Sequence, residues 1–132
     1  MKVLALDYGS ARTGVAVSDP TGTVARPLGV VERAGTEPGL ERLAELIRSE
    51  EAELVVVGLP LTMGGKHGEQ ADEALLFLDS LRRLVDVQVE SFDERFTTDL
   101  AERDPVADAP EDARAAAHLL SNYLEWSSGA RA

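Results

Sequence analysis

Four acidic residues, far apart along the chain, begin or end segments whose apolar pattern predicts a protein core. Asp7 ends an apolar run, and Asp112 stands near the start of a helical stripe. Asp93 and Glu94 end an alternating segment between them. When such carboxylates meet at one edge of a sheet they bind divalent metal ions, which commonly serve phosphoryl chemistry. The function therefore depends on whether these acids converge.

Asp7 and Asp112 each have an ordinary structural explanation beside the chemical one. Asp7 could cap a turn through its own backbone, but ligand sites of α/β sheets also lie outside the carboxyl ends of the strands. Asp112 in the first turn of a helix favours the helix dipole. It also precedes Ala116 by four residues and Leu119 by seven, which places it on the buried stripe of that helix.

For the middle pair, strand alternation leaves open which acid points inward. Asp93 shares its parity with Val89, and Glu94 shares its parity with Phe92. The neighbouring Arg95 could bind a substrate phosphate or neutralise one of the acids. An exposed acidic loop is the structural alternative for the pair.

Three carboxylates held close together repel one another and raise one another's pKa. A fold tolerates this arrangement only with a bound cation or with shared protons. Two divalent ions roughly 3.5–4 Å apart can hold the attacking water and the leaving oxygen of a phosphodiester hydrolysis. Sites built from oxygen ligands accept both Mg²⁺ and Mn²⁺.

Two glycine-rich segments, 9–14 and 58–68, could approach an anion through their backbone amides. The first lacks Gly-x-Gly and precedes a strand, so it is not a dinucleotide-binding fingerprint. The second has His67 where a P-loop needs Ser or Thr after its lysine. Lys66 could still reach a phosphate backbone, and so could Arg12 in the first segment.

The composition indicates a cytoplasmic protein with one domain. The chain has 132 residues, 44% of them hydrophobic, and no cysteine, which excludes disulfides and thiolate chemistry. No apolar run reaches the roughly 18 residues that span a bilayer, and an acid at position 7 is too early for a signal peptide. The net charge of −11 is unusual for a nucleic-acid-binding protein, which normally has a basic face.

The apolar periodicity predicts an α/β fold with a mixed sheet and helices on both faces. The first two strands should form an antiparallel hairpin, and Thr36 is the expected N-cap of the first helix. We expect one domain over 1–126 and a flexible tail over 127–132. The predicted strands cover 3–6, 14–19, 24–31, 54–57 and 85–92, and the predicted helices cover 36–47, 71–81 and 110–126.

Four blocks of the sequence, in order, resemble the YqgF family, also called RuvX. They are 6–19 with Asp-Tyr-Gly and Arg-Thr-Gly, 57–71 with Val-Gly-Leu-Pro, 93–98 with Asp-Glu-Arg-Phe, and 112–124 with its Asp, Ala and Leu pattern. Together they span nearly the whole chain and are highly specific.

The resemblance implies an RNase H-like fold with a five-stranded mixed sheet flanked by helices. It implies a nuclease that uses Mg²⁺ or Mn²⁺, with two ions held by Asp7, Glu94 and Asp112 as catalytic and metal-binding residues. From the residues themselves, we expect Asp93 to support these ligands and Arg12, Lys66 and Arg95 to contact the substrate. The family is associated with trimming the 5′ end of the 16S ribosomal RNA precursor.

Two departures from the family pattern leave other functions open. The segment 104–111 is acidic where the family has a basic stretch, and Ser121 replaces a usual glutamine. One alternative is a nuclease acting on Holliday junctions or on branched or single-stranded DNA in repair or recombination. Another is a non-catalytic nucleic-acid or assembly module. A sugar-kinase-like phosphotransferase also begins with Asp-x-Gly, but it closes two domains, and this chain supplies one. A homodimer and a ribosome-assembly partner remain open.

Overall fold

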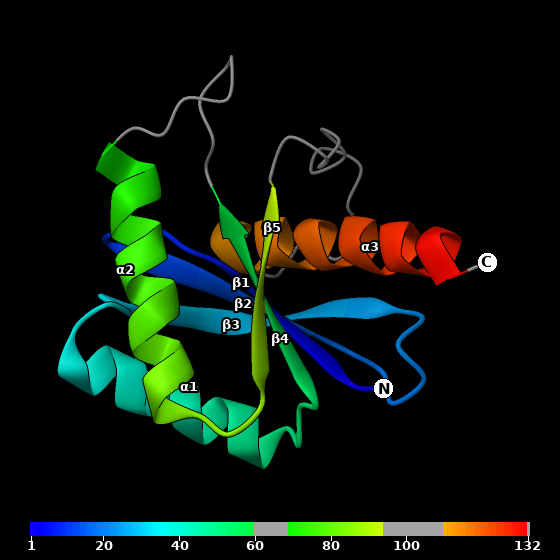
Figure 1. The fold of residues 1–132 in the computed structure, drawn as a ribbon, viewed down its shortest axis with the longest axis horizontal. Coiled ribbons are helices and arrows are strands. Elements are labelled where there is room, and N and C mark those ends of the chain that lie inside the picture. The colour runs from blue at the N-terminus through cyan, green and yellow to red at the C-terminus, as the bar shows by residue number, and fades with distance from the viewer. Residues whose placement is uncertain (60–68, 94–109, 132) are drawn as a thin grey trace.

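The computed structural model describes residues 1–59, 69–93 and 110–131 (Figure 1). Among these residues, no helix is long and apolar enough to cross a membrane. The elements in chain order are β1 (Val3–Asp7), β2 (Arg12–Ser18), β3 (Ala25–Glu32), α1 (Glu37–Ser49), β4 (Leu54–Leu59), α2 (Glu69–Leu84), β5 (Gln88–Asp93) and α3 (Glu111–Arg131).

The five strands form one mixed sheet in the order β3-β2-β1-β4-β5. The hairpin strands β1, β2 and β3 pair antiparallel, and β4 pairs parallel with both β1 and β5. The central position of β1 agrees with its apolar side chains, because a strand covered on both faces has no polar side. The predicted fold class and the predicted antiparallel hairpin are both confirmed.

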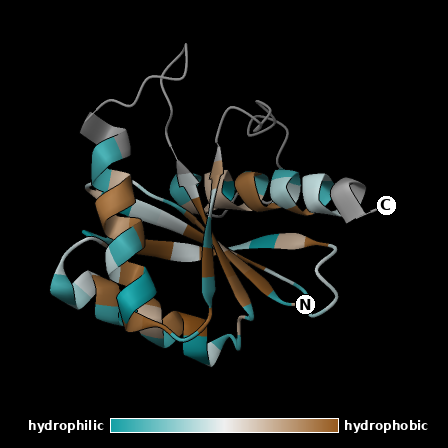
Figure 2. Ribbon diagram, viewed as in Figure 1, coloured by the Kyte–Doolittle hydropathy of each residue, from teal (hydrophilic) through white to brown (hydrophobic). Residues whose placement is uncertain are grey.

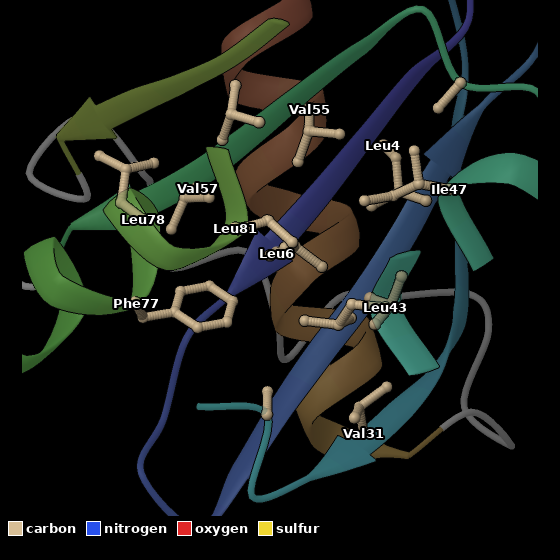
Figure 3. Packing of buried hydrophobic residues seen from close by; sticks show 14 residues of the cluster. Leu4, Leu6, Val31, Leu43, Ile47, Val55, Val57, Phe77, Leu78 and Leu81 are labelled. Carbon is tan, nitrogen blue, oxygen red and sulfur yellow. The ribbon is translucent and has the colours of Figure 1, made fainter. Parts of the chain in front are cut away.

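The side chains of β1 alternate between two cores, one on each face of the sheet. Leu4 and Leu6 pack with α1 and α2 in the core that Figure 3 shows. Val3 and Ala5 pack on the other face against α3 residues, among them Leu120. Figure 2 shows hydrophobic residues gathered on the central strands, whereas hydrophobic and hydrophilic positions alternate along α1 and α2. The alternation fixes the face on which the last residue of β1 must lie.

Helix α1 begins as predicted, whereas two other boundaries differ from the prediction. The Thr36 hydroxyl accepts a hydrogen bond from the Gly39 amide at 3.3 Å, which caps the helix. Strand β5 begins at Gln88, three residues after its predicted start, because Val85 still donates its amide to the Leu81 carbonyl at the end of α2. Helix α3 continues through Arg131, where a flexible tail was predicted from 127. No proline interrupts that segment, and the Ser127 hydroxyl donates to the Leu124 carbonyl at 3.3 Å.

The turn between β2 and β3 is organised by the Asp19 carboxylate. It accepts hydrogen bonds from the Thr21 hydroxyl and amide and from the amides of Thr23 (2.8 Å) and Val24 (2.9 Å). The Thr21 hydroxyl, followed by the Val24 and Thr23 amides, lowers the pKa of Asp19 well below its usual range.

We expect Asp19→Asn to lower the melting temperature by a few degrees at pH 7, since the neutral amide replaces an ionised acceptor. A lowered pKa stabilises the fold above the unfolded pKa of about 4, and this contribution is lost as the pH falls toward the folded value. The difference between the two proteins should therefore shrink at pH 3. Circular dichroism melts check this, with the exposed Asp86→Asn as the control. Equal melting temperatures at pH 7 would contradict it.

Candidate active site

Asp7 ends the central strand between two glycines on the neighbouring strands. Its register partners are Gly14 on β2 and Gly58 on β4. Because Val3 and Ala5 lie on the α3 face, strand alternation places the half-buried Asp7 on that face as well. Since both partners are glycines, neither register partner of Asp7 carries a side chain.

The first turn of α3 rests directly on Gly14. A Cβ atom added at Gly14 would lie 1.8 Å from the carbonyl oxygen of Asp112 and 2.4 Å from its carbonyl carbon. Only glycine therefore permits this approach of helix and strand. Because Asp7 is the register partner of Gly14, the contact brings Asp7 and the start of α3 to the same face and the same edge of the sheet.

Arg12, the predicted substrate contact, forms an ion pair with Asp112. Its Nε atom lies 3.3 Å from Oδ2 of Asp112, and the side chains are 65% and 38% exposed. An ion pair this exposed contributes little to stability, so Arg12 can leave Asp112 at small cost.

The loop between β1 and β2 holds Arg12 in place through a buried threonine. The fully buried Thr13 donates its hydroxyl to the Gly9 carbonyl at 3.3 Å and accepts from the Gly9 amide at 3.4 Å. A Cβ atom at Gly9 would lie 2.4 Å from the Arg12 carbonyl oxygen. The loop is therefore tightly closed, and β2 begins directly after it at Arg12.

The opposite face of the same edge carries residues that the sequence patterns did not single out. The ring of Tyr8 stacks on Phe77 of α2 with ring centroids 4.5 Å apart. Burial, followed by the charge of Glu73 and a hydrogen bond to it, raises the pKa of Tyr8. Two signals could have indicated this group: Tyr8 alternates with Asp7, and Glu73 and Phe77 are four residues apart on one helix.

The even-numbered positions of β5 face α3. The Phe92 ring meets the Tyr123 ring edge-on with centroids 5.4 Å apart, and the Tyr123 hydroxyl donates to the Glu90 carboxylate at 3.0 Å. Asp93 ends the strand and pairs through its backbone with Leu59. The predicted residues Glu94, Lys66 and Arg95 lie outside the described residues.

The structure thus brings two of the three predicted metal ligands, Asp7 and Asp112, to one face at one edge. Within 1–59, 69–93 and 110–131, no group of three Asp, Glu, His or Cys side chains could hold a metal ion. The third predicted ligand, Glu94, falls outside these ranges. Carboxylate oxygens such as those of Asp7 and Asp112 suit a hard divalent ion such as Mg²⁺ or Mn²⁺.

Comparison with curated proteins finds close relatives in bacteria. Residues 1–126 match the family described as "RuvX: Holliday junction resolvase". A protein of Roseiflexus sp. (strain RS-1) named "Putative pre-16S rRNA nuclease" is 46% identical over 102 residues, which cover 77% of this chain and 72% of that protein. A protein of the same name from Desulforamulus reducens is 35% identical over 139 residues, covering 99% of this chain and all of the other.

Solved structures of junction resolvases have the same fold. The RuvC protein of T. thermophilus in complex with a Holliday junction substrate superposes with a TM-score of 0.64 at 19% identity, covering 98% of this chain and 96% of RuvC. The fowlpox virus Holliday junction resolvase gives 0.56 at 11% identity, covering 96% and 99%. At these identities the likeness establishes the RNase H-like fold. The match over 1–126 and the level of identity to its relatives show that this chain belongs to the RuvX family, as its sequence blocks indicated.

Proposed function

We propose that this chain is a divalent-metal-dependent nuclease that hydrolyses phosphodiester bonds and processes the 5′ end of the 16S ribosomal RNA precursor. One observation carries the proposal: Asp7 and the start of α3 at Asp112 meet at Gly14, on one face of the sheet edge. The names of the relatives support the choice of substrate. Work on ribosomal RNA would place the protein in the cytoplasm, with a ribosome-assembly partner.

In this proposal the metal ligands are Asp7, Glu94 and Asp112. The position of Phe92 supports Glu94, because it faces α3 and strand alternation favours the same face for the residue two positions later. Asp93 is assigned the supporting role beside these ligands. When bound, two divalent ions would activate a water molecule and stabilise the leaving oxygen.

The residues of the chain hold the ions and orient the substrate. Asp7, on the last position of the central strand, is fixed by pairing on both sides, so its carboxylate needs little reorganisation. Arg12 is exposed and weakly paired. If a metal ion took its place beside the Asp112 carboxylate, the Arg12 guanidinium could bind a substrate phosphate instead. Lys66 and Arg95 are the further candidates for phosphate contacts.

Replacing Arg12 should weaken substrate binding more than turnover. We expect Arg12→Ala to raise the Kd for a labelled RNA about tenfold, because one charge-assisted hydrogen bond is lost, with kcat changed less than about threefold. Fluorescence anisotropy and single-turnover cleavage measure the two quantities. Arg26→Ala is the matched control, since Arg26 is also exposed and pairs with Glu50 at 3.6 Å. Binding that is equally tight in both variants would remove Arg12 from the substrate contacts.

The proposed activity is tested by cleavage of three labelled substrates: an RNA spanning the 5′ end of the 16S precursor, single-stranded DNA and a four-way junction. Each is incubated with Mg²⁺, with Mn²⁺ and with a chelator. Metal-dependent cleavage of the RNA in preference to both DNAs is the expected result. Preferred cleavage of the junction would instead favour the activity in the family description. If no substrate is cleaved, the result favours a non-catalytic nucleic-acid or assembly module, with which the net charge of −11 also agrees.

A further inference from the structure

A pocket of about 550 Å³ opens on the face of the sheet edge opposite to Asp7. It lies between the loop after β1, the turn before α1 and one side of α2, and it is lined among others by Tyr8, Arg33, Thr36, Glu73 and Leu76. Its volume is in the range of small-molecule sites. Because Tyr8 directly follows Asp7, the pocket and the candidate metal site occupy the two faces of one edge.

The apolar wall of the pocket is an aromatic pair with an exposed leucine beside it. Tyr8 stacks on Phe77 with an interplanar angle of 25°, and Phe77 is itself buried. Leu76, next along α2, is 70% exposed. Proteins commonly bind unstacked nucleobases by packing the flat face of the base against aromatic and apolar side chains. The aromatic pair and the solvent-exposed leucine beside it form a surface of this kind.

The polar side of the pocket selects the kind of ligand. Among the described residues that line it, Glu73 is the only acid, and the Tyr8 hydroxyl donates to it. A carboxylate has about four acceptor positions, so this hydrogen bond leaves Glu73 able to accept more. A carboxylate repels a phosphate and favours neutral N–H donors. Guanine presents two neighbouring donors, N1–H and N2–H₂, which fit the two oxygens of one carboxylate, whereas adenine, cytosine and uracil do not.

The rim of the pocket also carries a cation, Arg33, on a fixed turn. Arg33 has a positive φ of 48°. Its amide donates to the Ala11 carbonyl at 2.9 Å, and its carbonyl accepts from the Thr36 hydroxyl at 2.7 Å and amide at 3.0 Å. These bonds fix the turn in the absence of any ligand. A guanidinium at this rim can bind the phosphate of the same nucleotide whose base meets Glu73.

We propose that this pocket binds the unstacked guanine base of a nucleotide close to the cleaved bond. The role in cleavage rests on the proposed function, but the binding site itself does not. Asp7 and Tyr8 are adjacent in the chain, so a strand whose phosphate lies at the metal site can pass over the sheet edge and place a neighbouring base in the pocket. Glu73 reads the base, Tyr8 and Leu76 hold its face, and Arg33 contacts its phosphate.

The test is binding of mononucleotides to the purified protein in the presence of a chelator, followed by amide chemical shifts in NMR. GMP should bind saturably and shift the amides of Tyr8, Gly35 and Phe77. Its Kd should be about fivefold lower than that of IMP, which lacks the N2 amine, and also lower than those of AMP, CMP and UMP. Glu73→Gln should remove the difference between GMP and IMP, whereas the exposed Glu125→Gln on α3 should preserve it. The absence of GMP binding, or equal affinity for all five nucleotides, would overturn the proposal.

Repeating the titration with Asp7→Asn separates this proposal from the proposed nuclease activity. GMP should bind this variant as it binds the parent protein, because Asp7 lies on the other face of the sheet. If the protein prefers GMP but cleaves no substrate, the guanine-site proposal is supported and the nuclease proposal is contradicted. The protein could instead bind no GMP and cleave RNA equally well with inosine or guanine near the cut. This result would support the nuclease proposal and contradict the guanine-site proposal.

Discussion

Asp7→Asn should reduce metal-dependent cleavage by at least roughly 10³-fold while leaving the fold intact. Asparagine has nearly the same size as aspartate but no charge, so it cannot offset the charge of a divalent ion. The strand around it keeps its backbone pairing with Gly14 and Gly58, and the half-buried side chain is not part of either apolar core. The loss should therefore appear in turnover and not in stability.

Single-turnover cleavage and thermal melts of the same preparations check this prediction. Asp79→Asn is the matched control, because it removes an acid of the same kind from an exposed ion pair with Arg83 on α2. The control should cleave within about twofold of the parent protein. If folded Asp7→Asn cleaves normally, the carboxylate at the end of β1 is not a metal ligand, and the activity belongs to another site or to a contaminant.

Gly14→Ala should damage both stability and cleavage, because one added methyl group would displace the start of α3. The new Cβ atom would lie 1.8 Å from the Asp112 carbonyl oxygen and 3.1 Å from the Ala113 amide nitrogen. These are backbone atoms, which cannot rotate away as the end of a long side chain can. Overpacking of this kind destabilises a protein by about 1–3 kcal/mol or more. A shift of the first turn also moves Asp112 away from Asp7, so we expect a loss of cleavage of roughly 10²-fold or more.

Gly29→Ala provides the control for this prediction within the same sheet. Gly29 lies on β3 opposite Val15, and a Cβ atom added there meets nothing within 4 Å. Its effect on the free energy of unfolding should remain within about 0.5 kcal/mol, with normal cleavage. Urea unfolding and kcat/KM distinguish the two variants. Equal stability and activity of Gly14→Ala and Gly29→Ala would show that the contact between β2 and α3 does not position Asp112.

The sequence was sufficient for features that depend on short, regular patterns. The apolar runs predicted β1 and β4, and the structure has both strands at the centre of the sheet. The cap at Thr36 could also be predicted, because a hydroxyl followed by proline and a helical stripe is a local signal.

Contacts between distant segments could not be predicted in the same way. The approach of Asp112 to Gly14 and the ion pair of Asp112 with Arg12 depend on where α3 crosses the sheet, and no local pattern specifies that crossing. The pocket around Tyr8 likewise requires three elements to be placed together. The start of β5 was predicted too early because Val85 and Val87 pack against the same core as Val89. Both residues precede Gln88, where the pairing of β5 with β4 begins.

The acidity of the chain is compatible with a nuclease only if cations offset the charge at the site. With a net charge of −11, nonspecific attraction to nucleic acid is weak, and binding must rely on bound metal ions and on a few arginines. Arg12, which pairs with Asp112, and Arg33, which lines the pocket, are two such arginines.

The most direct test of the metal site is anomalous X-ray scattering from crystals grown with Mn²⁺. We expect a manganese peak bound by the carboxylates of Asp7, Asp112 and Glu94, and we expect this peak to disappear in crystals of Asp7→Asn. Manganese bound only elsewhere, or absent from this edge of the sheet at a concentration that supports cleavage, would contradict the proposed active site.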